Sequence, residues 1–138
     1  MAGHRHDWEH VVVFVQGGAL RLVSVSAHGE YEKREAGDGS LRIDGGTHAK
    51  VVYHKDGVGT HAFRFAAAGD DDVENHKGAW FRGPLVAWAA GFPGDTRDVL
   101  AGHDFGKANL GIKDSSFSGQ LGNARNEVVT DFDNDLDE

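Results

Sequence analysis

Four side chains that can bind a cation lie close together near the start of the sequence: His4, His6, Asp7 and Glu9. If a strand begins near Asp7, its twofold periodicity places Asp7 and Glu9 on one face and turns His6 away. Two carboxylates on an otherwise apolar face are costly unless a positive charge neutralises them. Ca²⁺ or Mg²⁺ prefers such oxygen ligands, whereas imidazole favours softer ions such as Mn²⁺ or Zn²⁺. With a hard ion, we expect His4 to act through bound water.

The same cluster has two other interpretations. Its spacing is also typical of a polar strand entry whose histidines and acids are simply solvated, and spacing alone slightly favours this interpretation. A metal-dependent hydrolase that uses His4 and Glu9 is a further alternative. No nucleophile turn of the Gly-x-Ser-x-Gly type is present, and Ser24 and Ser26 lie in an ordinary predicted strand, which argues against a serine hydrolase.

The composition excludes several classes of protein. The formal net charge is -8, which disfavours nucleic acid as a partner because phosphate binding needs clustered Lys and Arg. There is no cysteine, so disulfides and thiolate metal sites are excluded. The longest apolar run, residues 11–15, is far shorter than the roughly 18 residues of a membrane helix, so only peripheral membrane contact is expected. The first residues do not form a secretion signal.

Short apolar runs separated by glycines predict a mainly β protein. Residues 8–16 are rich in Val and Phe and predict a strand that is buried on both faces. A Gly-Gly pair follows, so residues 20–26 are expected to pair with this strand in a hairpin. Residues 47–54 and 60–67 predict a second hairpin, because the turn between them is rich in glycine.

The remaining segments complete a single predicted domain. Residues 30–34 are expected in a polar loop and residues 79–81 in a further strand. Short helices are expected over residues 95–101 and 114–121, since Asp or Ser stands at the start of each. The fold class predicted from these elements is an antiparallel β-sandwich with a few short peripheral helices. One domain is expected over residues 1–126, followed by an acidic, disordered tail over residues 127–138.

Several motifs in this order resemble one known family. Residues 3–13, GHRHDWEHVVV, resemble the heptapeptide region of the necrosis- and ethylene-inducing-like proteins, which are cytolysins of plant-associated fungi, oomycetes and bacteria. Residues 23–29 resemble the family's next strand, and the Tyr-His and Thr-His-Ala-Phe motifs of the second hairpin resemble its Tyr-His…His-Ala-Leu hairpin. Residues 104–109, DFGKAN, and residues 113–117, KDSSF, resemble its late segment.

The resemblance implies a secreted toxin with a β-sandwich like those of actinoporins and fungal lectins. The family binds a divalent cation beside a cavity for the sugar headgroup of plant sphingolipids, and then damages the plasma membrane. Carried over by position, the metal-site candidates are His4, Asp7, Glu9 and His61, and the glycan-binding candidates are His28 and Asp56. Ca²⁺ or Mg²⁺ is the expected ion, with Mn²⁺ as an alternative, and the protein is expected to be a monomer.

The two candidate histidines outside the heptapeptide also have structural interpretations. His61 is equally expected as a hydrogen-bonded histidine beside Phe63 and Phe65, and His28 as an exposed turn residue. The sequence also departs from the family's pattern. The family carries a segment before the heptapeptide that supplies an acidic metal ligand, so we expect this chain to lack that segment and to bind metal less tightly.

A second departure concerns the turn of the second hairpin. Residues 55–59 include no aromatic side chain, whereas plant-toxic members often have a Trp in this loop. Without that Trp the loop has no aromatic anchor for the membrane interface. A non-lytic, lectin-like binder of glycans or glycolipids on the same scaffold is therefore the alternative function, with the hydrolase as a further one.

Overall fold

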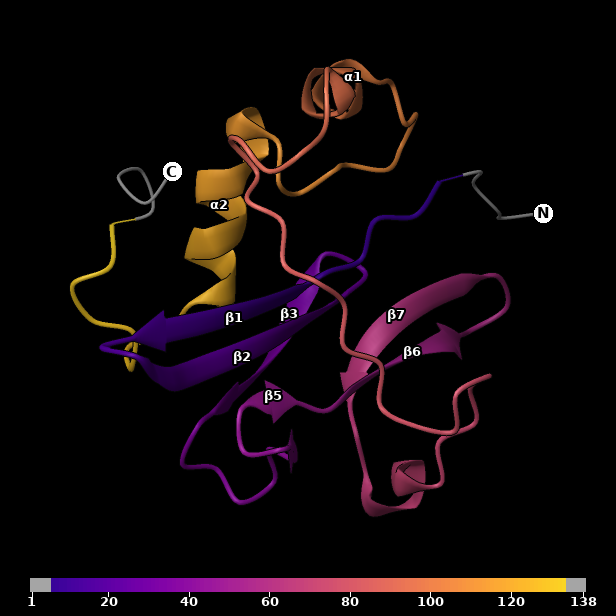
Figure 1. Cartoon of the computed structure of the whole chain (residues 1–138), viewed down its shortest axis with the longest axis vertical. Coiled ribbons are helices and arrows are strands. Elements are labelled where there is room, and N and C mark those ends of the chain that lie inside the picture. Colours follow the sequence, from indigo (N-terminus) through magenta and orange to yellow (C-terminus); the bar gives the residue numbers. More distant parts are fainter. Residues whose placement is uncertain (1–5, 134–138) are drawn as a thin grey trace.

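A computed structural model describes residues 6–133 of the chain (Figure 1). The central sheet is antiparallel with the strand order β1-β2-β3, and its strands are β1 (Val11–Gln16), β2 (Ala19–Ala27) and β3 (Glu30–Glu35). Gly17 and Gly18 form the turn between β1 and β2 with φ angles of 61° and 74°. A side chain at either position would be strained, which explains why glycine occurs at both. The first predicted hairpin is confirmed.

A second antiparallel hairpin consists of β6 (Val51–Asp56) and β7 (Thr60–Phe65). Tyr53 lies opposite Phe63 in this pair, and Lys55 lies opposite His61. Two short strands, β4 (Ile43–Asp44) and β5 (His48–Ala49), pair with each other just before the hairpin. The second predicted hairpin is therefore also confirmed, although the expected strand over residues 47–54 is divided between β5 and β6.

The core consists of two hydrophobic clusters, one on each face of β2. Leu22 and Val23 are consecutive residues with no exposed surface, because successive side chains of a strand point to opposite faces. The buried residues of the first cluster are Phe14, Leu22, Leu121, Ala124 and Val129. Those of the second cluster are Val23, Val25, Leu41 and Phe65. The second cluster joins the central sheet to the β6–β7 hairpin, which forms the other layer.

Short helices follow the strands: η1 (Ala68–Asp71), α1 (Thr96–Gly102) and α2 (Asp114–Ala124). Helix α2 packs against the central sheet, while α1 lies farther from it (Figure 1). Ser24 in β2 donates a hydrogen bond of 2.6 Å to the Ala124 carbonyl at the end of α2, so a buried hydroxyl is satisfied. In the described part of the chain no helix is long and apolar enough to cross a membrane. The predicted class, mainly β with antiparallel sheets and short helices, is confirmed.

Three local expectations were wrong. Residues 30–34 belong to strand β3 and not to a loop, because the backbone of β3 pairs with β2 from Ala27 to Leu22. Residues 79–81 form no strand in the described structure. Strand β1 is not buried on both faces, since Val13 and Val15 are 50% and 62% exposed. The β6–β7 hairpin covers the middle of the sheet and leaves this part of β1 open.

The chain beyond α2 returns to the central sheet. Val129 is buried, Val128 is partly buried, and Phe132 contacts Phe14 with ring centroids 5.4 Å apart. Residues 127–133, which the sequence places in a disordered tail, therefore pack on the first cluster through their apolar side chains. The rest of that tail lies outside the described residues.

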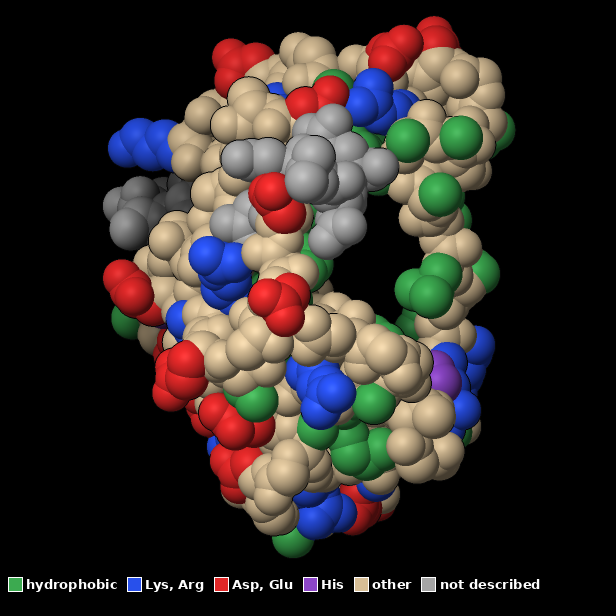
Figure 2. Space-filling view, turned by 90° about the vertical axis from the view of Figure 1, so that its left-hand side faces the viewer, with side chains coloured by type: hydrophobic (Ala, Val, Ile, Leu, Met, Phe, Trp, Pro, Cys, Tyr) green, Lys and Arg blue, Asp and Glu red, His purple; other side chains and the backbone are tan. Residues whose placement is uncertain are grey.

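Hydrophobic side chains are exposed in the segment between η1 and α1. Leu85 is fully exposed, and Phe81 and Val86 are 66% and 51% exposed. Figure 2 shows an opening in the molecule with hydrophobic side chains along one side of it, and charged side chains of both signs elsewhere on this face. The segment therefore adds little to the core.

Candidate functional site

A cavity of about 290 Å³ lies where the chain enters β1, beside the turn between β2 and β3. It is lined by Asp7, Trp8, Glu9, His10, Ser26, His28, Gly29, Tyr31, Thr60, Lys107, Ala108, Asn109 and Gln120. Both hairpins, the loop before α2 and α2 itself contribute to this set. A concave site with several convergent polar groups is typical of a binding site for a small ligand.

Glu9 holds the β2–β3 turn against the start of β1. Ser26 donates its hydroxyl hydrogen to Oε2 of Glu9, and the backbone N–H of His28 donates to Oε1 over 3.4 Å. The backbone N–H of His10 donates to the Ser26 hydroxyl oxygen over 2.8 Å, and Ser26 is almost fully buried. Hydrogen bonds to a carboxylate are stronger than those between neutral groups, so Glu9 fixes the rim of the cavity.

A second chain of hydrogen bonds connects β1, β3 and α2. The Tyr31 hydroxyl donates to Oε1 of Gln120 over 2.7 Å, which leaves its oxygen to accept from Nε2 of His10. Burial lowers the pKa of His10, although the nearby Glu9 carboxylate acts in the opposite direction. Burial also raises the pKa of the Tyr31 phenol, and the charge of Glu9 raises it further. His10 is therefore favoured in its neutral form, as a donor to Tyr31.

The two glycan-binding candidates from the sequence lie next to each other. Nε2 of His28 is 2.9 Å from a carboxylate oxygen of Asp56, so the β2–β3 turn is connected to the β6–β7 turn. His28 has a positive φ of 55° and is exposed, as expected for a turn residue, and it also lines the cavity. The Thr60 hydroxyl donates to the Asp56 carbonyl over 2.5 Å, which fixes the second turn.

The predicted metal-site residues are only partly brought together. Asp7 and Glu9 both line the cavity, whereas His61 does not. His61 is exposed and stacks on Tyr53 with ring centroids 5.4 Å apart and an interplanar angle of 21°. His4 lies outside the described residues. Among the described residues, no group of three or more His, Cys, Asp and Glu side chains could hold a metal ion.

His6 has aromatic neighbours outside the cavity. Its ring lies 5.9 Å from that of His103 and 5.4 Å from that of Phe105. Trp8, which does line the cavity, contacts the same Phe105 with centroids 5.2 Å apart. Edge-to-face contacts with Phe105 therefore hold the segment before β1 in place, and His6 does not line the cavity.

Several cavity residues were not identified from the sequence. Tyr31 was assigned to a loop, and nothing in the spacing of Gln120 indicates a role beyond the helix. Lys107 and Asn109 lie in the DFGKAN segment that carries part of the family resemblance. That motif is the signal in the sequence that could have identified these two residues.

Comparison with known proteins gives consistent results. Residues 1–124 match the model of the family described as necrosis inducing protein (NPP1). NLP effector protein 14 of Phytophthora capsici is 32% identical over 127 residues, with 88% of this chain and 86% of that protein covered. Necrosis-inducing protein NPP1 of Phytophthora nicotianae is 34% identical over 127 residues, which cover 88% of this chain and 48% of that protein.

Solved structures of similar proteins share the fold. The structure of NLPPya in complex with glucosamine has a TM-score of 0.70 and 33% identity, with 91% of this chain and 54% of that chain covered. A structure of the same protein in complex with mannosamine has the same TM-score. This chain thus spans about half the length of these solved proteins. With the family model matching most of its length, the chain belongs to the necrosis-inducing protein (NPP1) family of toxins.

Proposed function

We propose that this protein is a secreted, toxin-like binder of sugar headgroups on plant membrane sphingolipids, and that the binding site is the cavity beside Glu9. The observation that carries the proposal is the joint placement of Asp7 and Glu9 in a concave site with neutral and basic polar groups. Lys107, Asn109 and Gln120 line the same cavity as the two carboxylates. Such a mixture of donors and acceptors suits a polyhydroxylated ligand.

The similarity to sugar-bound relatives supports this choice of ligand. The two NLPPya structures contain glucosamine and mannosamine, which carry a protonated amino group as well as hydroxyls. The carboxylates of Asp7 and Glu9 complement such an ammonium ion. The function proposed is therefore binding followed by membrane damage, and not catalysis.

We also propose that a divalent cation assists this binding. Asp7 and Glu9 provide carboxylate oxygens of the kind that Ca²⁺ and Mg²⁺ prefer, and one oxygen of Glu9 already accepts from Ser26. Two carboxylates can bind a hard ion only if water molecules complete its coordination shell, so we expect the ion to bind weakly. When bound, the cation would polarise sugar hydroxyls, and it would replace the ammonium group as the partner of the two acids. His4 and His61 remain predictions as further ligands.

Calcium is expected to raise the melting temperature, and the Asp7→Ala variant is expected to lose this response. At about ten times its Kd, a ligand stabilises the folded state by about 1.4 kcal/mol, which corresponds to a few degrees in Tm. Differential scanning fluorimetry with Ca²⁺, Mg²⁺ and EDTA measures the effect. Asp98→Ala is the matched control, because Asp98 is an exposed acid on α1 whose loss should leave the response intact. An unchanged Tm in calcium for the parent protein would contradict the cation proposal.

One observation favours a non-lytic binder as the second candidate. Val58 is at the tip of the β6–β7 turn and is fully exposed, and no aromatic residue accompanies it there. An aromatic side chain at such a tip would supply an anchor at the membrane interface. Binding to the headgroup without disruption of the bilayer is consistent with this turn.

Dye release from vesicles that contain plant sphingolipids distinguishes the two candidates. The toxin hypothesis predicts leakage that depends on the sphingolipid, with vesicles of phosphatidylcholine alone as the control. Co-sedimentation with the same vesicles measures binding independently. Sedimentation without leakage would assign the protein to the non-lytic class, and neither sedimentation nor leakage would contradict both hypotheses.

A further inference from the structure

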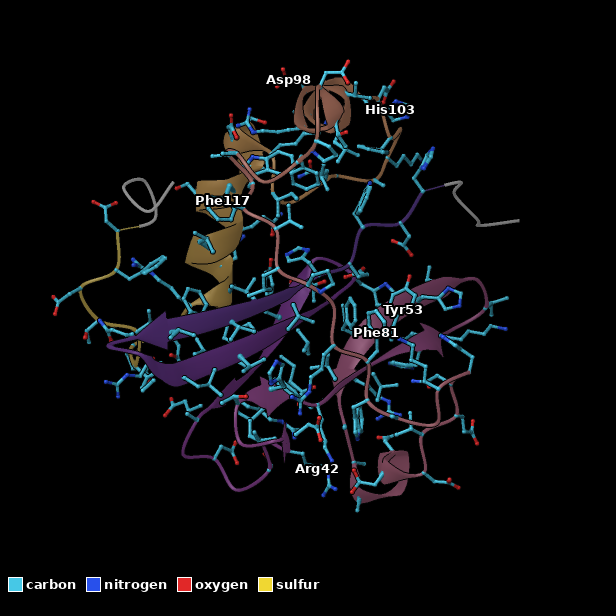
Figure 3. All side chains as sticks on the ribbon, in the orientation of Figure 1. Arg42, Tyr53, Phe81, Asp98, His103 and Phe117 are labelled. Carbon is cyan, nitrogen blue, oxygen red and sulfur yellow. The ribbon has the colours of Figure 1, made fainter. Side chains whose placement is uncertain are left out.

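A second and larger groove, of about 770 Å³, runs along the β6–β7 hairpin. One wall is formed by the two strands and includes Tyr53 and Phe63. The other wall is formed by the segment after η1 and includes Trp80 and Phe81. Figure 3 shows Tyr53 and Phe81 near each other at the hairpin. Aromatic residues from distant parts of the chain therefore border one open space.

The rings in this groove are accessible to a ligand. Tyr53 is 50% exposed and Phe81 is 66% exposed, whereas Phe63 and Trp80 are partly buried. The centroids of Tyr53 and Phe63 are 5.0 Å apart, at an interplanar angle of 52°. A ligand that packs on these exposed rings would bury apolar area, and the rings would lose little conformational entropy because their neighbours already hold them.

Polar groups accompany the rings, and one of them is held in place. Arg64 donates two hydrogen bonds of 2.7 Å to the carboxylate of Asp70, which also accepts from the backbone N–H of Ala67 over 2.7 Å. This bidentate pair fixes the base of the groove. Asp72 and Glu74 also line the groove and are exposed, so their carboxylates are accessible as hydrogen-bond acceptors.

The β6–β7 hairpin contributes residues to both this groove and the cavity beside Glu9. Burial raises the pKa of the Tyr53 phenol, and the negative charges of Asp7 and Glu9 raise it further. Strand β7 runs from Thr60, which lines the first cavity, to Phe63, which lines the groove. Thr60 and Phe63 are three residues apart on an extended strand, so roughly 10 Å of backbone separates a residue of the cavity from a residue of the groove.

We propose that the groove is a second saccharide subsite, which binds a sugar residue linked to the one held beside Glu9. The apolar C–H face of a sugar ring would pack on Tyr53 and Phe81, and its hydroxyls would donate to Asp72 and Glu74. This inference rests on the proposed sugar binding at the first cavity. It adds that the protein recognises an oligosaccharide headgroup and not a single sugar.

The three tryptophans of the chain provide separate reporters for a test by NMR. Trp8 lines the first cavity and Trp80 lines the groove. Trp88 lies elsewhere, where it donates to Asp114 over 3.0 Å beneath Arg97. In the ¹⁵N-labelled protein, glucosamine is expected to shift the indole N–H signal of Trp8 alone. The β-linked oligomers of glucosamine, from dimer to tetramer, are expected to shift Trp8 and Trp80, with Trp88 unchanged.

Substitution of Tyr53 tests the same inference by affinity. The Tyr53→Ala variant is expected to bind the oligomers about 3- to 10-fold more weakly, as the loss of one aromatic contact predicts, and to bind glucosamine as before. The Tyr53→Phe variant keeps the ring and should retain the oligomer affinity. Isothermal titration calorimetry measures all three proteins, and a thermal melt of each shows that the fold is intact.

The outcomes separate the inference from the function on which it rests. A Trp8 shift with every ligand, but no Trp80 shift with any oligomer, overturns the second subsite and leaves the first intact. A Trp80 shift without a Trp8 shift overturns the proposed continuity between the two sites. If neither signal moves with any sugar, both the proposed function and this inference are wrong.

Discussion

Replacement of Glu9 by Gln is expected to weaken the binding of glucosamine by about 10- to 100-fold. One oxygen of Glu9 accepts from the Ser26 hydroxyl and the other accepts from the backbone N–H of His28. The carboxylate thus holds the β2–β3 turn at the rim of the cavity, and it also supplies charge for the sugar's ammonium group. A hydrogen bond to a charged group contributes about 1.5–3 kcal/mol, which corresponds to this loss of affinity.

Isothermal titration calorimetry with glucosamine measures this effect directly. The matched control is Glu32→Gln, because Glu32 is on β3 and forms an exposed ion pair of 2.8 Å with Arg34. The control removes one negative charge outside the cavity, so the affinity of this variant for glucosamine should stay within about twofold of that of the parent protein. Equal losses in both variants would show that net charge, and not the placement of Glu9, decides binding.

Replacement of Leu22 by Ala is expected to destabilise the protein by about 2–5 kcal/mol. Leu22 has no exposed surface and packs between the central sheet and helix α2. Helix α2 is fixed to β2 by the hydrogen bond from Ser24 to the Ala124 carbonyl. The residues around Leu22 therefore have little freedom to move into the space that the substitution leaves. Urea unfolding measures the change as a lower midpoint with an unchanged slope.

Val13→Ala is the matched control on the neighbouring strand. Val13 is 50% exposed and lies opposite Val23 in the β1–β2 pair. Its truncation removes apolar area that is already in contact with water, so a cost below about 1 kcal/mol is expected. A similar cost for Val13→Ala and Leu22→Ala would contradict the structural finding that β1 is open on one face.

Local patterns in the sequence were sufficient for most of the secondary structure. Both hairpins, across Gly17-Gly18 and across residues 57–59, were predicted because glycine turns and apolar runs act over a few residues. Helices α1 and α2 were predicted from their starting residues and differ from the expected ranges by a few positions at their ends. Strand β3 was missed because most of its residues are charged. This segment forms a strand because its backbone pairs with β2 and because Tyr31 packs against the first hydrophobic cluster.

The candidate site was only partly predictable from the sequence, because some of its contacts join segments that are far apart in the chain. The sequence by itself placed Asp7 and Glu9 together just before an apolar strand, although β1 begins at Val11 and not near Asp7 as expected. Its ordered motifs indicated the family, which the comparisons confirm. The tertiary structure alone decided that His28 meets Asp56, since these residues come from turns of two different hairpins. It likewise placed His61 on Tyr53 and not in the cavity.

The physical distinction is one of distance along the chain. Turn chemistry and side-chain periodicity are set by neighbouring residues, so they can be read from a short window of sequence. The contact of Tyr31 with Gln120 joins residues on β3 and α2, and it depends on how α2 packs against the sheet through Leu22 and Leu121. Hydrophobic burial drives that packing, but it is a non-directional force and does not select particular partners. The resulting arrangement of sheet, hairpin and helix determines which polar side chains meet at the cavity.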